Sequence, residues 1–506
     1  MFFLHKIDPT EGQIRWVAVL LSILFSIVVI AQDQVINNDG ALYLIVSDLI
    51  TQGEWRAAFA RYPWPFLSIL ISYTSQATGL LPEYAAYLLS TLFFVLLVLC
   101  FVDFVRQLGG DRRTQLLAAL LILTLPYLNE SRAEILRDHG YWFFYLLGLR
   151  FLFKHYQTPT LFTGLAWNAA ILASCLFRME GVVMMALLPF ILLLKRELPL
   201  KQRFAALLQA NWIALFLLVL GLMALPFAGD NLGRLAEFPL RLIHFWDALT
   251  VGLAQKAEVI RAGVLPVLSA KFAMQSVVLI LALIIVVKTL TVITSLHAVV
   301  LFLPRLYAEA VLPRGFRPFV AWVVLINLLM LIIFLLPTFF LQARFTMPLV
   351  LTVLLLLPFL LNQAWHLWQQ KRAGFFYSHL FPVAIVIILL MGADGLVSMG
   401  GYSKSYLLDA AEWIEQKSET DSKIVTSESD RFCYYIGRNN AFEERPQCHY
   451  RVKPRANMAF DYLVLYQKRG VMPDGWKAYL GETDLHEVAK FENSRHDGMV
   501  IYQQNR

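Results

Sequence analysis

Charged residues are scarce in this sequence of 506 residues: they make up 16% of it, whereas hydrophobic residues make up 58%. A soluble globular protein has about 25% charged and about 45–50% apolar residues. The composition therefore excludes an ordinary soluble protein over most of the chain. The sequence also lacks a run of Lys and Arg and a basic surface interleaved with aromatics. Despite the net charge of +7, nucleic acid is therefore not an expected partner.

Cysteine is rare as well, with four residues in the chain. Cys100 and Cys175 lie in apolar segments, and we interpret them as packing residues. Cys433 and Cys448 lie in the polar C-terminal part, at a spacing that would close a short loop. If that part is outside the cytoplasm, a disulfide is expected. Only His449 adjoins this pair and no second cysteine pair exists, so a zinc site is not expected.

Long apolar runs are abundant. They recur in windows of roughly 18–20 residues, enough to cross a hydrocarbon core about 30 Å thick. Because they lack the alternation of barrel strands, we predict a polytopic membrane protein with about eleven transmembrane helices. The first span, residues 14–31, is interpreted as a retained anchor, with a cleaved signal peptide as the alternative. We expect a membrane domain over residues 1–399 and a soluble domain over residues 400–506.

The orientation follows from the short loops, because their Lys and Arg residues fall on alternate junctions and so on one side. This distribution predicts a cytoplasmic N-terminus and, with eleven spans, an extracytoplasmic C-terminal domain. That domain has the pattern of a small α/β unit, without a nucleophile elbow or Gly-rich phosphate loop. We expect a helix over residues 406–415 and strands over 423–427, 462–466, 486–491 and 499–502.

Charges gather in the loops on the outer side. The first outer loop, residues 32–83, is long and contains two amphipathic stretches, 41–53 and 64–73, which we predict to be interfacial helices. Asp39 precedes them in the turn Asn37-Asn38-Asp39-Gly40.

The other outer loops also contain charges at or near membrane depth. The residues are Arg137, Asp138, His139, Arg178, Glu180 and Arg344. Any one of them could be a snorkelling side chain or part of a structural ion pair. Several on one side favour a shared polar cavity, because charges in a membrane usually face a cavity or one another. Arginines suit phosphate, and carboxylates can deprotonate a hydroxyl or bind a divalent cation. We therefore predict group transfer from a lipid-linked phosphate at the outer face.

These motifs resemble the GT-C superfamily of integral membrane glycosyltransferases, in particular the protein-mannosyltransferase and aminoarabinose-transferase-like enzymes of bacteria. The order and common side of the segments carry the resemblance, which covers about residues 1–361. The segments are Asn38-Asp39-Gly40-Ala41-Leu42-Tyr43, Arg61-Tyr62-Pro63-Trp64-Pro65, Arg137-Asp138-His139, Arg178-Met179-Glu180-Gly181 and Gln342-Ala343-Arg344-Phe345-Thr346-Met347-Pro348.

The resemblance implies a polyprenyl-phosphate sugar donor, an inverting displacement and a site at the outer face of the bacterial cytoplasmic membrane. By this likeness Asp39 is the general base, and Asp138 orients the base, binds the sugar or holds a cation. Arginines would stabilise the departing phosphate. His139 and Glu180 are expected to support these residues. For His139, a purely structural role is the alternative. The residues expected at the phosphate are Arg61, Arg344, Arg137 and Arg178.

The second outer loop departs from the pattern, because it lacks the Asp-x-Asp pair of some metal-dependent relatives. No metal site is predicted, and a divalent cation is left open. The long stretch 229–271, which includes Arg234 and Arg241, has no match in the pattern and is interpreted as a lid. A transporter of lipid-linked sugars and a non-catalytic envelope scaffold are the alternatives. The sequence does not specify the sugar or the acceptor, which could be a lipid, a glycan or a protein.

Overall fold

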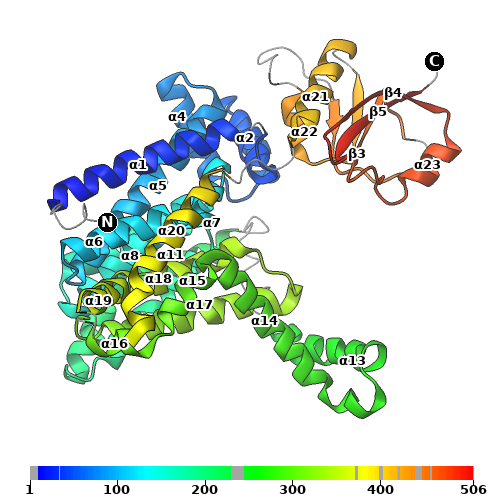
Figure 1. Ribbon diagram of the computed structural model, residues 1–506. Coiled ribbons are helices and arrows are strands. Elements are labelled where there is room, and N and C mark those ends of the chain that lie inside the picture. The colour runs from blue at the N-terminus through cyan, green and yellow to red at the C-terminus, as the bar shows by residue number, and fades with distance from the viewer. Residues whose placement is uncertain are drawn as a thin grey trace. The chain divides into compact units, whose positions relative to one another are not determined.

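The computed structural model describes residues 9–33, 35–228, 244–310, 312–370, 374–397, 403–419, 422–436, 438, 447–455 and 458–504. The chain divides into two compact units (Figure 1). The first comprises Met1–Phe25, Ser90–Asn129 and Arg137–Gly395, and the second comprises Ser26–Leu89, Glu130–Leu136 and Leu396–Arg506. The expected domain boundary between residues 399 and 400 lies outside the described residues.

The chain begins with a series of helices. Their bounds are α1 Glu11–Gln32, α2 Asn38–Thr51, α3 Trp55–Arg61, α4 Phe66–Thr78, α5 Pro82–Gln107, α6 Arg112–Leu123, α7 Pro126–Glu130, η2 Ser131–Ala133, α8 Asp138–Gln157, α9 Leu161–Phe177, α10 Glu180–Leu187, η3 Leu188–Leu194 and α11 Leu200–Ala228.

Helices continue after the gap that follows α11. Their bounds are η6 Ala248–Gly252, α13 Leu253–Gly263, η7 Val267–Phe272, α14 Ala273–Ile293, α15 Ser295–Leu301, α16 Pro304–Glu309, α17 Phe316–Thr338, η8 Ala343–Thr346, α18 Met347–Leu354, α19 Leu357–Gln370 and α20 Gly374–Val397.

The protein is a multi-pass helical membrane protein, as the sequence predicts. Among the described residues, five helices are long and apolar enough to cross a membrane, and a sixth is added if one bent pair counts as a single span. The five candidates are Glu11–Gln32, Pro82–Gln107, Val267–Ile293, Phe316–Thr338 and His379–Val397. The expected number of about eleven spans also counts shorter apolar helices such as α9. That these shorter helices cross the membrane stays a prediction.

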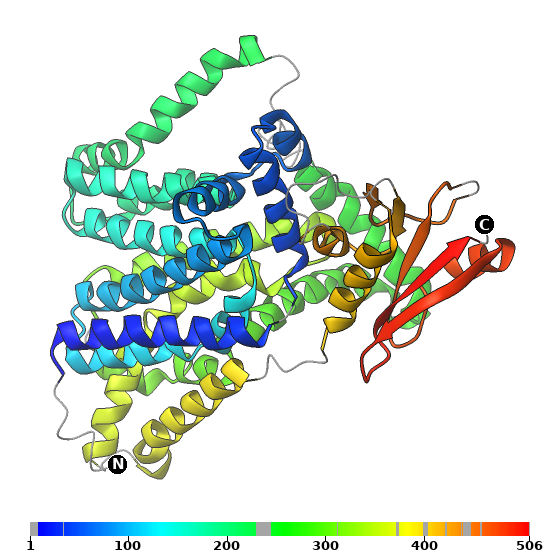
Figure 2. The ribbon, with the colours of Figure 1, turned by 90° about the horizontal axis from the view of Figure 1, so that it is seen from above.

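The core of the first unit is built from large side chains between closely packed helices. α8 and α9 lie side by side (Figure 2). Gly148 of α8 allows this close approach, because a Cβ atom there would come within 3.2 Å of the Trp167 ring on α9. Polar side chains inside this core are hydrogen-bonded: Asn327 of α17 donates to the hydroxyl of Tyr145 on α8 at 2.7 Å. Such pairs satisfy groups that lipid cannot.

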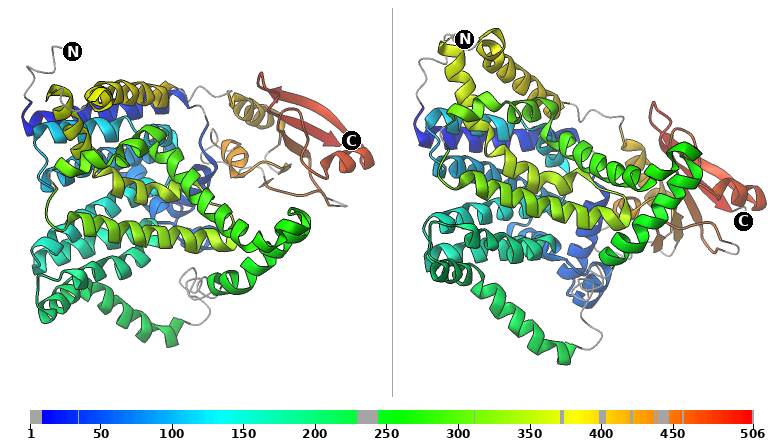
Figure 3. Two further views of the ribbon diagram at one scale, coloured as in Figure 1. Left: turned by 60° about the horizontal axis from the view of Figure 1, so that its bottom comes forward. Right: turned by 90° about the horizontal axis from the view of Figure 1, so that it is seen from below.

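The stretch interpreted as a lid is helical where the structure describes it. Arg234 and Arg241 lie outside the described residues. Farther along, α13 packs on α14 through an apolar cluster that includes Ala257, Val277 and Leu281, and the two helices are drawn together in the left panel of Figure 3.

In the second unit, residues 32–83 contain the two helices expected from the sequence; their place in the membrane interface stays a prediction. The expected helices over residues 41–53 and 64–73 correspond to α2 and α4. Helix α3 lies between them.

The C-terminal part is the expected small α/β unit. Its elements are α21 Ser405–Lys417, β1 Lys423–Thr426, α22 Asp430–Tyr435, β2 Gln447–His449, β3 Tyr462–Gln467, α23 Trp476–Glu482, β4 Leu485–Glu492 and β5 Gly498–Gln504. The strand order is β2-β1-β3-β5-β4; β1 pairs in parallel with β2 and β3, and β5 is antiparallel to β3 and β4. The sequence predicted four of these strands and missed the three-residue β2.

Helix α20 depends on two glycines for its packing. A Cβ atom on Gly392 would lie 2.6 Å from the Cβ atom of Thr124, and one on Gly395 would lie 2.9 Å from the Cα atom of Pro126. Small residues allow helices in a membrane to approach closely.

We expect Gly392→Leu to destabilise the protein by about 1–3 kcal/mol, because the larger side chain overpacks this contact. The measurement is the thermal unfolding of the detergent-solubilised protein. Ala393→Leu is the matched control, since Ala393 on the same helix is exposed. Equal stability of both variants would contradict the packing role of Gly392.

Candidate functional site

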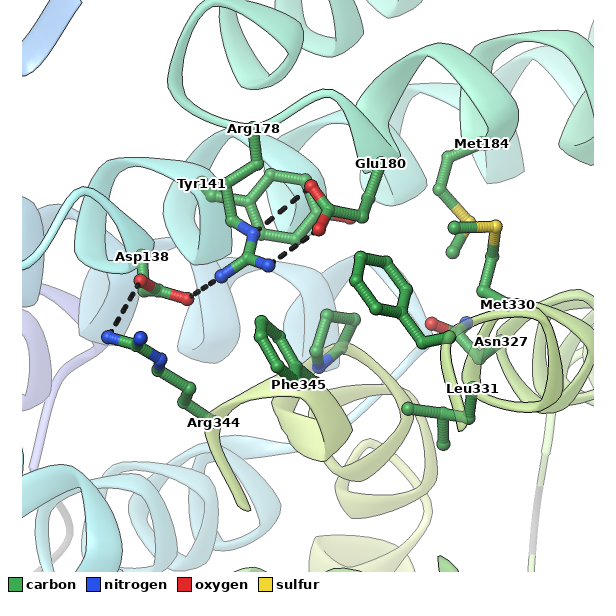
Figure 4. Close-up of a pocket in the computed structure, with 12 residues that line it drawn as sticks. Asp138, Tyr141, Arg178, Glu180, Met184, Asn327, Met330, Leu331, Arg344 and Phe345 are labelled. Atoms are coloured by element: carbon green, nitrogen blue, oxygen red, sulfur yellow. Dashed lines mark hydrogen bonds and ion pairs between the residues drawn. The ribbon is translucent and has the colours of Figure 1, made fainter. Parts of the chain in front are cut away.

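A pocket in the first unit collects four of the charged residues singled out in the sequence. It lies between helices α8, α10, α17 and α18 and the turn η8 (Figure 4). Its lining residues are Asp138, Tyr141, Arg178, Glu180, Met184, Asn327, Met330, Leu331, Phe334, Arg344, Phe345 and Pro348.

Arg178 is the centre of an ion-pair cluster at one end of this pocket. Its Nη1 atom donates to Asp138, and its Nε and Nη2 atoms donate to the two carboxylate oxygens of Glu180 at 3.2 and 2.6 Å. The side chains of Asp138 and Arg178 are only 2% and 4% exposed. Every nitrogen of this guanidinium therefore serves a carboxylate, and Arg178 holds two buried acids that would otherwise repel each other.

The local chain geometry explains how these residues meet. Asp138 starts α8, and Glu180 starts α10, so both carboxylates lie in a first helical turn, where backbone N–H groups favour negative charge. Gly140 lets α8 approach the end of α9, because a Cβ atom there would overlap the buried ring of Phe177. Arg178 follows that phenylalanine directly.

Arg344 reaches the same cluster from the opposite wall. It lies in η8, and its Nη1 atom is 3.8 Å from Asp138 Oδ2. Its side chain is 20% exposed, compared with 4% for Arg178. The ring of Phe345 lies under Arg178, with the guanidinium carbon 4.5 Å from the ring centroid. Arg344 is therefore the guanidinium of this pair with more room for a ligand.

Two further predicted residues flank the cluster. Arg137 precedes α8, and its charge stabilises the ionised forms of both Asp138 and Glu180. His139 is buried and packs against the rings of Phe94 and Trp142, with centroids 4.5 and 5.4 Å apart.

Three guanidinium groups lie near the two carboxylates of this cluster, those of Arg137, Arg178 and Arg344. They place positive charge at one end of the pocket, an arrangement that suits an anion.

Asp39 lies in the second unit, in the first turn of α2, and the residues around it hold the backbone of this turn. Asn37 accepts a hydrogen bond from the backbone nitrogen of Ile135 at 2.8 Å and donates to its carbonyl at 3.3 Å. A Cβ atom on Gly40 would lie 2.7 Å from the Asn37 side chain and 3.0 Å from Ile135, so only glycine fits there. The turn that carries Asp39 is therefore tied to residues of the second outer loop.

Arg61, which the resemblance assigns to the phosphate, has a carboxylate partner in its own unit. Its Nη2 atom donates to Asp430 at 2.6 Å, and its guanidinium lies 4.7 Å from the centroid of the Tyr450 ring. Cys433 and Cys448 are joined by a disulfide, with their Cα atoms 5.6 Å apart. Beside Asp430, burial works against ionisation of Glu428, but the ion pair with Arg431 and a hydrogen bond from Ser429 hold its pKa below the usual value.

The described residues contain no group of three or more His, Cys, Asp or Glu side chains that could hold a metal ion.

Comparison with known proteins identifies the fold. No protein-family model matches the sequence, and no curated protein is significantly similar to it. The crystal structure of ArnT from Cupriavidus metallidurans bound to undecaprenyl phosphate matches 96% of this chain and 97% of its own, with a TM-score of 0.57 and 14% identity. The chain has the ArnT fold.

Two further structures are similar. The apo state of the same ArnT matches with a TM-score of 0.52 and 13% identity, over 96% of this chain and 97% of its own. The archaeal oligosaccharyltransferase AglB from Archaeoglobus fulgidus has a TM-score of 0.48 and 14% identity, over 86% of this chain and 64% of its own. The match to ArnT, a GT-C glycosyltransferase, confirms the fold inferred from the sequence motifs.

The structure adds residues to the pocket that the sequence analysis missed. Tyr141 and Asn327 line it, and Met184, Met330 and Leu331 form its apolar end. In an ArnT fold these side chains come from three helices, and each looks like an ordinary apolar or core residue in sequence.

We expect Arg178→Gln to destabilise the protein by about 3–5 kcal/mol, because removing one partner leaves two buried carboxylates without their counter-charge. The measurement is thermal unfolding in detergent. Arg261→Gln is the control: Arg261 pairs with Glu258 on an exposed helix surface, where such pairs contribute little to stability. Similar losses in both variants would contradict the role given to Arg178.

Proposed function

We propose that this protein is a polyprenyl-phosphate-sugar-dependent glycosyltransferase that acts at the outer face of the cytoplasmic membrane. One observation carries the proposal: in an ArnT fold, a pocket joins an arginine-rich, ion-paired end to an apolar end. The match to an ArnT structure that holds undecaprenyl phosphate supports the same class of donor.

The charge of the pocket suits the donor. A polyprenyl phosphate sugar is a phosphodiester with one negative charge, which suits the arginines at one end of the pocket. When the sugar leaves, the lipid becomes a phosphate monoester and its negative charge grows. A guanidinium at this phosphate stabilises the transition state more than the bound donor, which is the condition for catalysis.

We assign the phosphate to Arg344. It is more exposed than Arg178, and its link to Asp138 is longer. Arg178 keeps Asp138 and Glu180 ionised and oriented, and its donors are already engaged. Arg137 adds positive charge. Asp138 orients Arg344, and the apolar residues Met184, Met330 and Leu331 provide a surface for the uncharged part of the ligand.

The reaction is a single displacement at the anomeric carbon. The acceptor hydroxyl oxygen forms a bond to that carbon while the bond from carbon to phosphate oxygen breaks, and its electron pair leaves with the polyprenyl phosphate. The proton of the hydroxyl passes to a carboxylate, which we assign to Asp39 from its place in the first-loop motif. Attack opposite to the leaving phosphate inverts the anomeric centre.

The topology in this proposal follows the Lys and Arg distribution of the short loops: a cytoplasmic N-terminus and an extracytoplasmic C-terminal domain in a bacterial inner membrane. The acceptor is a hydroxyl of a lipid, a glycan or a protein.

We expect Asp39→Asn to lower transfer at least about 100-fold, because the amide cannot take the proton of the acceptor. The assay measures transfer from a panel of radiolabelled polyprenyl phosphate sugars, in membranes with equal amounts of each variant. Asp48→Asn, on the same helix, is the control and should retain activity. An Asp39→Asn variant as active as the wild type would refute the assignment of the base. A wild type that transfers no sugar would instead favour a transporter or a scaffold.

We expect Arg344→Gln to lower kcat/KM for the donor about 100-fold, because the leaving phosphate loses its positive partner. Polyprenyl monophosphate without a sugar should inhibit the wild type and lose most of this effect on the variant. Arg261→Gln again serves as the control. Unchanged inhibition of Arg344→Gln would place the phosphate at another residue.

A further inference from the structure

A short segment of the C-terminal domain contacts the first outer loop at two residues that precede Asp39, Ile36 and Asn38. We call residues 428–435, which include α22, the clamp segment. The hydroxyl of Tyr435 accepts a hydrogen bond from the backbone nitrogen of Ile36 at 2.9 Å. The hydroxyl of Ser429 lies 2.7 Å from the side-chain oxygen of Asn38 and 2.8 Å from Glu428 Oε1, so its single proton is shared between these two acceptors. Ile36 and Tyr435 are buried, so the bond between them does not compete with water, whereas the Ser429 bond ends on the exposed Asn38.

The clamp segment makes a third contact farther along the same loop. Asp430, buried in α22, accepts the hydrogen bond of Arg61, the last residue of α3. The Tyr450 ring beside Arg61 restricts the guanidinium further. Removing Arg61 would leave a buried carboxylate unpaired, so this contact holds the loop more firmly than an exposed ion pair would.

The helix of the clamp segment is too short to be stable by itself. α22 has six residues, and isolated helices of this length are not stable. The disulfide from Cys433 fastens it to Cys448 in β2, the edge strand that pairs with β1. The sheet therefore supports α22 through a covalent link, and α22 supports the first loop through polar contacts.

We propose that Ser429, Asp430 and Tyr435 are positioning residues for Asp39 and that the Cys433–Cys448 disulfide is required to keep them in place. The C-terminal domain is then part of the catalytic apparatus, and transfer depends on an oxidising compartment. This inference rests on the proposed role of Asp39 as the base. It gives the C-terminal domain a role in catalysis.

The first test exchanges the charges of the pair. Arg61→Asp and Asp430→Arg should each lower kcat about tenfold with little change in the KM for the donor, and the double variant should recover most of the loss. A tenfold loss corresponds to about 1.4 kcal/mol in the activation barrier. The control exchanges Lys490 and Glu492, an ion pair on β4 of the same domain, and should leave kcat unchanged. A double variant no better than the singles would overturn the pairing role.

The second test separates positioning from general stability. Each clamp variant is combined with Asp39→Asn. If the clamp acts through Asp39, it should have little further effect on the residual transfer in that background. Equal fold losses in both backgrounds would mean that the clamp only stabilises the protein. Full activity of Asp39→Asn alone would instead refute the proposed base.

The third test measures the contact between Tyr435 and Ile36 directly, without an activity assay. Tyr435→Phe removes the acceptor of the Ile36 amide, so hydrogen exchange in the peptide spanning residues 35–44 should become faster; Tyr434→Phe is the neighbouring control. Reduction of the wild type with a phosphine should speed the same exchange and lower transfer. Cys433→Ser/Cys448→Ser should show both effects without reductant and no further response to it. Unchanged exchange in Tyr435→Phe and in the reduced protein would overturn the inference.

Discussion

The burial of one guanidinium between two carboxylates determines the geometry of the pocket. Asp138 and Glu180 are at the starts of two different helices, and Arg178 joins them where water is largely excluded. None of the three charges is stable there without the other two. The cluster therefore fixes how α8 meets the junction of α9 and α10, and Gly140 provides the space that this approach needs.

The ion pairs of Arg178 also suggest different roles for Arg178 and Arg344. A guanidinium whose nitrogens all serve carboxylates is a poor ligand for phosphate, whereas its neighbour across the pocket can change partners. A substrate anion at Arg344 would compete with Asp138, so binding would transfer part of that positive charge from carboxylate to phosphate. Under the proposed assignment, the Arg178–Asp138 ion pair contributes to catalysis indirectly, because it keeps Asp138 held by another arginine while Arg344 binds the ligand.

Much of the fold could be predicted from sequence. Long runs of high hydropathy indicate the membrane helices, and the spacing of apolar residues indicates four of the five strands. The residues that line the pocket were partly predictable, since buried charges in apolar segments have few other uses. Their partners were not. Asp138 and Arg178 are separated by 40 positions and Asn38 and Ser429 by 391, and a pattern in one segment does not specify a partner in another. Helix α22 was missed because six polar and aromatic residues carry no periodic signal.

The two candidate acids are supported by different kinds of interaction. Asp138 lies among helices, where the packing of apolar side chains and a buried ion pair define its position. Asp39 lies in a turn held by hydrogen bonds of Asn37 and Asn38 and by the close packing of Gly40. A general base must stay within a few tenths of an ångström of its working geometry. Hydrogen bonds can provide this accuracy only when their partners are fixed in advance and shielded from water. In this chain the partners of that turn come from the clamp segment, which a disulfide ties to a sheet. Under our proposal, holding this turn is the contribution of the C-terminal domain to catalysis.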